Sequence, residues 1–302
     1  MQLANLRLNG KAHSAIIEGD LAYILPDHRR SMVGLIESGT EGLAEIAALR
    51  KAEKLISMPL AEASLAPAID LFRRDVLCTG WNYWTHFEEG RGKRDGQEAE
   101  RPKAPTFFGK SPFAIIGPND DIGIDLKLSE KWDYEAEIAV IIGKAGRSIP
   151  RARAVDHVFG FCLANDISLR DIQRRHGGQW LKGKSIDGTT PLGPKIVTAD
   201  SVDIANLHFQ CILNGTTMQD ASVSQMAFPI DELIAELSSG MMLRPGDVIL
   251  TGTPSGVGYA RTPPVHLAVG DEVIVQGGVL GELRNKLVPV DLAGAFPTTA
   301  ET

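Results

Sequence analysis

From residue 75 onward, the sequence is a succession of short strand-like segments. Few of the stretches between them are as long as the helix that connects two parallel strands. The dipeptide Asn214-Gly215 lies where a tight hairpin turn would join two of the segments. The pattern therefore predicts an α+β fold that is mainly β, with a mostly antiparallel or mixed sheet and small helices. Eight segments have strand composition: VLCTG, TFFGK, FAIIG, EAEIAVIIG, VFGFCLAND, HFQCILNG, DVILTG and DEVIVQGG.

The N-terminal part of the chain has a different organisation. Residues 1–25 alternate between apolar and polar side chains and contain two turn-forming dipeptides, which is typical of short strands. Residues 31–55 carry apolar side chains at helical spacing. Residues 64–70 have no strong periodicity, as in a linker. We therefore expect a small accessory domain over residues 1–70 and a larger domain over residues 71–302.

Charge and cysteine content exclude several classes of protein. The formal net charge of −7 argues against a nucleic-acid or anionic-membrane partner. No apolar run approaches the ~20 residues of a membrane helix, and the first residues lack the pattern of a signal peptide. Cys78, Cys162 and Cys211 lie far apart and form no CxxC pair, which favours reduced thiols. We therefore expect a cytoplasmic protein.

Two glutamates interrupt an otherwise apolar strand-like segment, DYEAEIAVIIGK. Alternate residues of a strand share a face, so Glu135 and Glu137 point to the same side. Two like charges in a covered strand repel each other and lose hydration, and a bound cation is the simplest group to offset that cost. The alternative is that the first half of this strand protrudes into water.

A third carboxylate, Asp166, closes the next strand-like segment. Three carboxylates with no His or Cys near them in the sequence form an all-oxygen ligand set. Such a set suits Mg²⁺, Mn²⁺ or Ca²⁺ and does not suit Zn²⁺. The spacing alone leaves open whether the three side chains meet.

The segment GQWLKGKS, residues 178–185, matches the phosphate-loop pattern G-x-x-x-x-G-K-[ST]. That motif requires a strand before the loop and a helix after it. Here a polar, helix-like segment precedes it, and Gly188, Pro191 and Gly193 prevent a helix after it. The context argues against a nucleotide site and leaves the role of Lys184 open at this point.

A possible general base occurs in CTGWNYWTHFEEGR, where His86 and Glu89 are three residues apart and share one face of a helix. A histidine held by a carboxylate is a common general base near neutral pH, although a surface pair has the same spacing. Residues 88–103 are crowded with charge of both signs and lack an apolar face. This composition predicts a mobile loop, either an active-site lid or a solvated segment without a role.

Together, six ordered blocks resemble the fumarylacetoacetate hydrolase family. They are CTGWNYWTHFEE, PTFFGKSP, DYEAEIAVIIGK, NDISLRDIQ, GQWLKGKSIDGTTPLGP and GDVILTGTPSGVG. The resemblance covers about residues 75–290, and less specifically the small N-terminal domain that many members carry. It implies a mixed β-roll fold and a homodimer.

The resemblance also implies roles for individual residues. It implies that Glu135, Glu137 and Asp166 bind one Mg²⁺ or Mn²⁺, with Ca²⁺ as a further ion that a crystal can hold. The other implied roles are a water-activating dyad of His86 and Glu89, an active-site lysine at Lys184, and substrate contacts from Arg170, Gln173 and Thr253. We further expect a lid over residues 84–103 whose closure places Trp84 or Phe87 against the substrate tail.

A 2-oxo acid or β-diketone chelates a hard cation through two oxygens, so the implied partner is a small 2-oxo or diketo acid. The dyad favours a hydrolase that cleaves a C–C bond in an acylpyruvate-like substrate. One alternative is a lyase on the same metal site, such as an oxaloacetate decarboxylase or a 2-oxo acid hydratase or isomerase. The other is a non-catalytic ligand-binding relative, against which intact His86, Glu89 and Lys184 argue.

Overall fold

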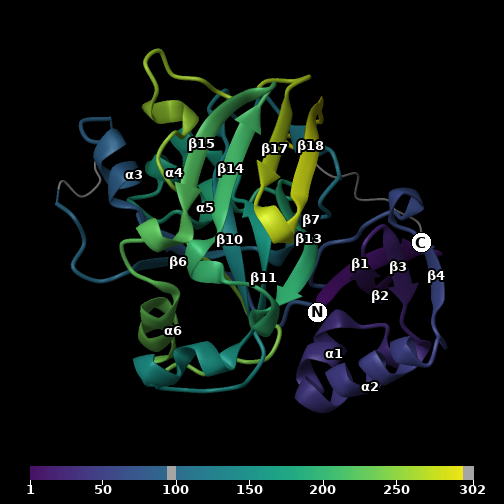
Figure 1. Ribbon diagram of the computed structural model, residues 1–302. Helices are drawn as coiled ribbons and strands as arrows, with labels where there is room; N and C mark the ends of the chain where they lie inside the picture. Colours follow the sequence, from purple (N-terminus) through teal and green to yellow (C-terminus); the bar gives the residue numbers. More distant parts are fainter. Residues whose placement is uncertain (94–99, 295–302) are drawn as a thin grey trace.

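The structure is a computed structural model that describes residues 1–93 and 100–294 (Figure 1). The strands are β1 (Gln2–Leu8), β2 (Lys11–Glu18), β3 (Leu21–Ile24), β4 (Ile56–Pro59), β5 (Val76–Gly80), β6 (Thr106–Lys110), β7 (Ile115–Ile116), β8 (Ile122–Ile124), β9 (Trp132–Asp133), β10 (Ala136–Ile142), β11 (Val158–Asn165), β12 (Ser168–Leu169), β13 (Thr190–Thr198), β14 (His208–Leu213), β15 (Thr216–Ser222), β16 (Val248–Leu250), β17 (Glu272–Gln276) and β18 (Glu282–Pro289). The α-helices are α1 (Met32–Glu37), α2 (Gly39–Lys51), α3 (Trp84–Glu89), α4 (Arg170–Arg175), α5 (Leu181–Lys184) and α6 (Ile230–Ser238). The mainly β, mixed α+β fold predicted from the sequence is confirmed.

The larger of the two main sheets contains eleven strands within the described residues. Its main path runs β4-β3-β2-β1-β13-β11-β10-β16-β5-β6, and β7 pairs with β13. The N-terminal meander β1–β4 therefore continues the sheet of the larger part, because β1 pairs antiparallel with β13. The division near residue 70 stays a prediction, since a shared sheet does not decide where a folding unit ends.

A five-stranded sheet, β15-β14-β17-β18-β8, packs against one face of the large sheet, and α1 and α2 cover part of the other face (Figure 1). Strand β10 runs between these two layers. Its side chains Ile138 and Val140 join the core shared with the five-stranded sheet. Ala139 and Ile141 join the core shared with α1 and α2. The expected covering of this strand on both faces is confirmed.

Two features differ from the sequence expectations. The single helix expected over residues 31–55 is divided into α1 and α2, because Gly39 has a positive φ of 56° and the Ser38 hydroxyl donates to the Leu35 carbonyl at 2.6 Å. Strand β13 was not expected, because its sequence TPLGPKIVT contains two prolines. Pro194 lies where the register with β11 shifts, between Val197 and Gly193, and Pro191 pairs with Ile116 of β7.

None of the helices within residues 1–93 and 100–294 combines the length and apolar composition that a membrane-crossing segment requires.

Candidate metal centre and active site

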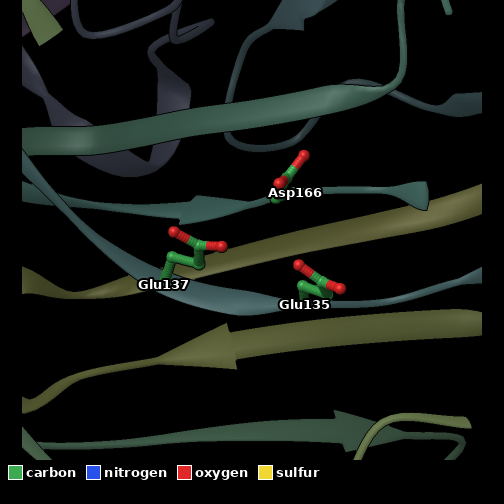
Figure 2. A group of neighbouring side chains, drawn as sticks. All are labelled: Glu135, Glu137 and Asp166. Carbon is green, nitrogen blue, oxygen red and sulfur yellow. The ribbon is translucent and has the colours of Figure 1, made fainter. Parts of the chain in front are cut away.

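The three candidate ligands converge where two paired strands end. Glu135 directly precedes β10 and Glu137 lies within it, while Asp166 directly follows β11. Because Ala136 pairs with Asn165 across the ladder, the three carboxylates share one space (Figure 2). One oxygen from each lies within 4.8 Å of the others. The question that the sequence spacing left open is therefore answered: the side chains meet.

This arrangement fits a divalent cation. All three side chains are buried, at 5%, 1% and 0% exposure for Glu135, Glu137 and Asp166. Burial raises the pKa of Glu137 well above its usual range, and the charges of Asp166 and Glu135 raise it further. The raised pKa of Glu137 means that the three carboxylates lack a compensating positive charge near this side chain. Hard oxygen donors with this deficit suit Mg²⁺ or Mn²⁺.

Lys184 lies on the same cluster. Its ammonium is 2.6 Å from Glu135 Oε2 and 2.9 Å from Asp166 Oδ2, and the residue is the last of α5. Burial alone would lower the pKa of Lys184, but the charges of Asp166 and Glu135 raise it above its usual value. The side chain is therefore held in its protonated form beside the candidate ligands.

The phosphate-loop match at residues 178–185 has an element order that the nucleotide motif does not have. The segment includes α5, is preceded by α4 and is followed by β13. A nucleotide site would have a strand before the loop and a helix after it, whose amide groups face the phosphates. Here a helix precedes the segment and a strand follows it.

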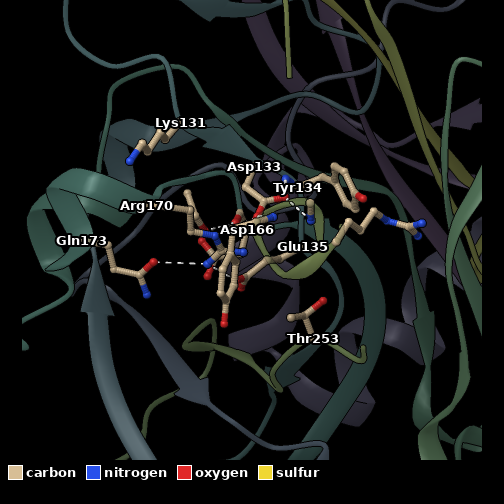
Figure 3. Close-up of polar contacts among 12 residues, drawn as sticks. Lys131, Asp133, Tyr134, Glu135, Asp166, Arg170, Gln173 and Thr253 are labelled. Carbon is tan, nitrogen blue, oxygen red and sulfur yellow. Dashed lines mark hydrogen bonds and ion pairs between the residues drawn. The ribbon is translucent and has the colours of Figure 1, made fainter. Parts of the chain in front are cut away.

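Arg170 and Gln173, both on α4, lie together on one side of the cluster (Figure 3). The Arg170 guanidinium contacts Asp133 Oδ2 at 2.8 Å and Glu135 Oε1 at 2.6 Å, and it donates to Gln173 Oε1 at 3.2 Å. Asp133 also accepts from the backbone N–H groups of Gly258 and Tyr259. The guanidinium is thereby fixed in orientation before any ligand arrives.

The His86–Glu89 pair is formed within α3. The imidazole Nδ1 lies 2.7 Å from Glu89 Oε1. Because a carboxylate only accepts, Nδ1 carries the proton and Nε2 presents a lone pair. The other oxygen of Glu89 accepts from the Gly256 backbone N–H at 2.7 Å, which fixes the carboxylate in turn. His86 lines the same cavity as Glu135 and Lys184.

Thr253 and Trp84, the remaining two residues predicted to contact substrate, differ in their position relative to the cavity. Thr253 lines the cavity, but its hydroxyl already donates to the Ala136 carbonyl at 2.9 Å and accepts from Gln219 at 2.7 Å. Trp84 lies outside the cavity lining and packs against Phe228 with a ring distance of 5.5 Å. Residues 94–99 of the expected lid lie outside the described residues. The lid and the role of Trp84 stay predictions.

Several residues of the site were not anticipated as parts of it. Trp180 and Phe108 supply an aromatic wall, with ring centroids 5.1 Å apart, and Trp81 lies 4.8 Å from Trp180. Lys110 lies on the side of Asp166 that Lys184 leaves free, with its ammonium 2.8 Å from Oδ1. A lysine that ends an apolar strand, as in TFFGK, was the available signal for that position. Arg174 and Tyr259 also line the cavity.

The sequence model described as fumarylacetoacetate hydrolase C-terminal matches residues 75–288. Among curated relatives, the mitochondrial oxaloacetate tautomerase FAHD2A of Bos taurus is 43% identical over 273 residues, which is 89% of this chain and 83% of that protein. The oxaloacetate tautomerase YisK of Bacillus subtilis is 41% identical over 229 residues, 76% of this chain and 74% of that protein.

Solved structures are also similar. A fumarylacetoacetate hydrolase from Exiguobacterium antarcticum superposes with a TM-score of 0.83 at 33% identity, covering 96% of this chain and 100% of that one. A maleylpyruvate hydrolase from Sphingobium, solved with manganese(II) and pyruvate, has a TM-score of 0.77 at 29% identity, with 96% and 99% covered.

Proposed function

The chain belongs to the fumarylacetoacetate hydrolase family, and on that premise we propose that it is a divalent-metal-dependent enzyme that interconverts the enol and keto forms of oxaloacetate. The observation that carries the proposal is the contact of the Lys184 ammonium with two of the three converging carboxylates. This contact places a proton donor next to a cation site within one cavity. The activity named for relatives at 41–43% identity supports this reaction over others of the family.

In this proposal, Glu135, Glu137 and Asp166 hold the cation. When bound, it supplies positive charge that stabilises the negative charge developing on a substrate oxygen during enolisation. Conversion of enol to keto requires one proton to join C3 and one proton to leave the enol hydroxyl. Lys184 is protonated and buried beside the ligands, so it donates to C3. The hydroxyl proton restores the ammonium, and the reaction consumes no co-reactant.

Arg170 orients the substrate in this scheme. Its guanidinium is held by Asp133, and its Nη2 atom has no hydrogen-bond partner within the described residues. This remaining donor suits one oxygen of a substrate carboxylate. Gln173 is hydrogen-bonded to Arg170 and lines the same cavity. The rings of Trp180 and Phe108 supply apolar lining to the same cavity.

The proposal is tested by following the loss of enol absorbance of oxaloacetate with Mn²⁺-loaded enzyme. Lys184→Met should lower kcat by about 10²–10⁴-fold, the usual worth of a positioned acid or base. Lys182→Met is the matched control, because Lys182 is exposed on the same short helix. Unchanged tautomerisation in Lys184→Met would reject the proposed role. Binding of metal and oxaloacetate without turnover by the unmodified protein would instead favour a non-catalytic relative.

A second candidate function is hydrolysis of an acylpyruvate-like substrate. The observation that favours it is the chain of hydrogen bonds from His86 through Glu89 to the Gly256 N–H, which fixes a base for water activation. Decay of acylpyruvate absorbance tests this reaction. Release of CO₂ from oxaloacetate tests the lyase alternative on the same site.

The assembly and location of the protein are also part of this proposal. We expect a homodimer, which light scattering coupled to gel filtration tests. A cytoplasmic location agrees with three buried, unpaired cysteines. Fractionation of cells that express the protein tests it.

A further inference from the structure

Beside the metal cavity lies a second groove of about 350 Å³ with a basic lining. Five of its lining side chains are lysines or arginines, and none of its described lining residues is an aspartate or a glutamate. The cations come from four separate segments: Lys93, Lys131, Arg170 with Arg174 on α4, and Arg261. Their convergence on one groove is therefore a product of the tertiary fold.

The groove and the metal cavity share a wall. Arg170, Arg174 and Tyr259 line both. The guanidinium carbons of Arg170 and Arg174 lie 4.6 and 4.8 Å from the centroid of the Tyr259 ring. Figure 3 shows Arg170 between Lys131, on the groove side, and Thr253, on the side of the metal cavity. The groove and the metal cavity therefore adjoin at these three residues.

Within residues 1–93 and 100–294, the acceptors that hold two of these cations in place are neutral. Lys93 donates to the carbonyls of Ala260 and Arg261 and contacts the Thr262 hydroxyl at 3.3 Å. Arg261 donates to the carbonyls of Gly256 and Met218. Carbonyl oxygens satisfy the hydrogen bonds but leave the positive charge uncompensated. The groove therefore favours an anion.

Two buried polar atoms at the groove point to a missing partner. Arg170 is 3% exposed, and its Nη2 has no hydrogen-bond partner within the described residues. The same is true of His266 Nδ1 among those residues. Unpaired buried donors are rare in folded proteins, because each costs the free energy of its lost hydration. A bound oxyanion would supply an acceptor for Arg170 Nη2, and for His266 Nδ1 in the tautomer that carries its proton there.

We propose that this groove binds the distal carboxylate of a dicarboxylic 2-oxo acid whose 2-oxo acid end lies at Glu135, Glu137 and Asp166. The proposal rests on the proposed function, since it takes the metal cavity as the site of the 2-oxo acid. Arg170 has its Nη2 donor left for one oxygen of this carboxylate, and the positive charges of Lys131 and Arg174 attract the anion. The groove thereby selects dianionic over monoanionic substrates.

Calorimetric titration of Mn²⁺-loaded protein tests the proposal without requiring turnover. The matched probes are 2-oxoglutarate and 2-oxopentanoate, which share a five-carbon chain and differ in the distal carboxylate. We expect the unmodified protein to bind 2-oxoglutarate about 10–100-fold more tightly, as one or two charged hydrogen bonds provide. Lys131→Gln and Arg174→Gln should each lower this ratio about tenfold, and Lys131→Gln should leave the affinity for 2-oxopentanoate unchanged.

Arg175→Gln is the matched control, because Arg175 is exposed on the same helix and does not line the groove. The proposal is overturned if the ratio is near one in the unmodified protein, or if the groove variants and the control give the same ratio. Inorganic phosphate that binds together with 2-oxoglutarate, and is lost in the groove variants, would assign the groove to a separate anion and overturn the substrate role. If the ratio of the two affinities is preserved but the protein has no tautomerase activity, the proposed reaction is refuted and the groove proposal is not.

Discussion

Lys110 Nζ lies 2.8 Å from Asp166 Oδ1, and neither side chain has any exposed surface. The other oxygen of Asp166 contacts Lys184 at 2.9 Å. One candidate metal ligand is therefore held between two buried lysines that come from different parts of the chain. This pairing compensates part of the negative charge that three carboxylates bring into the core, and it fixes the direction in which Asp166 points.

Lys110→Met tests how much the Lys110–Asp166 contact contributes to the stability of the fold. The variant leaves one oxygen of a buried carboxylate without its cation, so we expect the free energy of unfolding to fall by about 3–5 kcal/mol. Urea denaturation in the presence of a chelator measures it. Lys127→Met is the control, because the Lys127–Asp291 pair is exposed and 3.7 Å long, and it should change stability by less than about 1 kcal/mol. Equal effects of the two variants would mean that Lys184 alone compensates Asp166.

Glu137→Gln separates metal binding from folding. Glu137 Oε2 accepts from the Gly252 N–H at 2.6 Å, and the amide oxygen of glutamine can accept the same bond. Apo stability should therefore be retained, because this hydrogen bond survives the substitution. In the unmodified protein, Mn²⁺ at about 100 times its Kd should stabilise by about 2.7 kcal/mol, and the variant should lose most of this gain. Thermal shifts with and without Mn²⁺ measure it, with exposed Glu130→Gln as control. A full Mn²⁺ shift in Glu137→Gln would refute the ligand assignment.

His86→Ala distinguishes the two candidate reactions. Hydrolysis needs a base for water, so kcat for an acylpyruvate should fall by about 10²-fold or more. The kcat for tautomerisation of oxaloacetate should fall much less, since this reaction depends on the cation and Lys184. Mn²⁺ affinity should not change, because the imidazole is not among the converging ligands. Glu88→Gln, on the same helix and bonded to Arg101 at its surface, is the control. Equally small losses on both substrates would remove hydrolysis from consideration.

Gly80→Ala tests the aromatic wall. A Cβ at residue 80 would lie 2.1 Å from an atom of the Trp180 ring, which lines the cavity, so the indole must move. We expect a loss of about 1–3 kcal/mol in stability from overpacking and a higher KM. The control is Gly109→Ala on the neighbouring strand, where the nearest atom is 3.4 Å away. Tryptophan fluorescence and steady-state kinetics report both effects, and an unchanged KM would place the wall outside the substrate path.

Local patterns predicted the parts of the site's centre, whereas the convergence of the three carboxylates was left open by spacing and implied only by the family resemblance. The alternation of Glu135 and Glu137 fixed their common face, and the position of Asp166 at a strand end placed it beside them once the strands paired. The His86–Glu89 bond also follows from spacing, because both residues lie on one turn of α3. These features depend on neighbours within a few residues or on one strand pairing, and periodicity encodes both.

The residues that surround the site could not be predicted from the sequence, for a physical reason. Lys110 reaches Asp166 and Thr190 only after β6 and β13 are in place. Trp180 is accommodated by the absence of a side chain at Gly80, a hundred residues earlier in the chain. The basic groove likewise gathers cations from separate segments. Such contacts carry no local pattern, because no periodicity relates residues that meet only through the tertiary fold.

The pairing of β1 with β13 has a consequence for synthesis of the chain. Gln2 lies opposite Val197, so the first strand meets its partner only after about 195 further residues have been made. At about 5–20 residues per second, the outer edge of the N-terminal meander waits roughly 10–40 s on the ribosome. An unpaired strand edge is a template for pairing with other chains. The nascent protein is therefore most exposed to aggregation during translation of its middle third, and a chaperone that shields strand edges would act then.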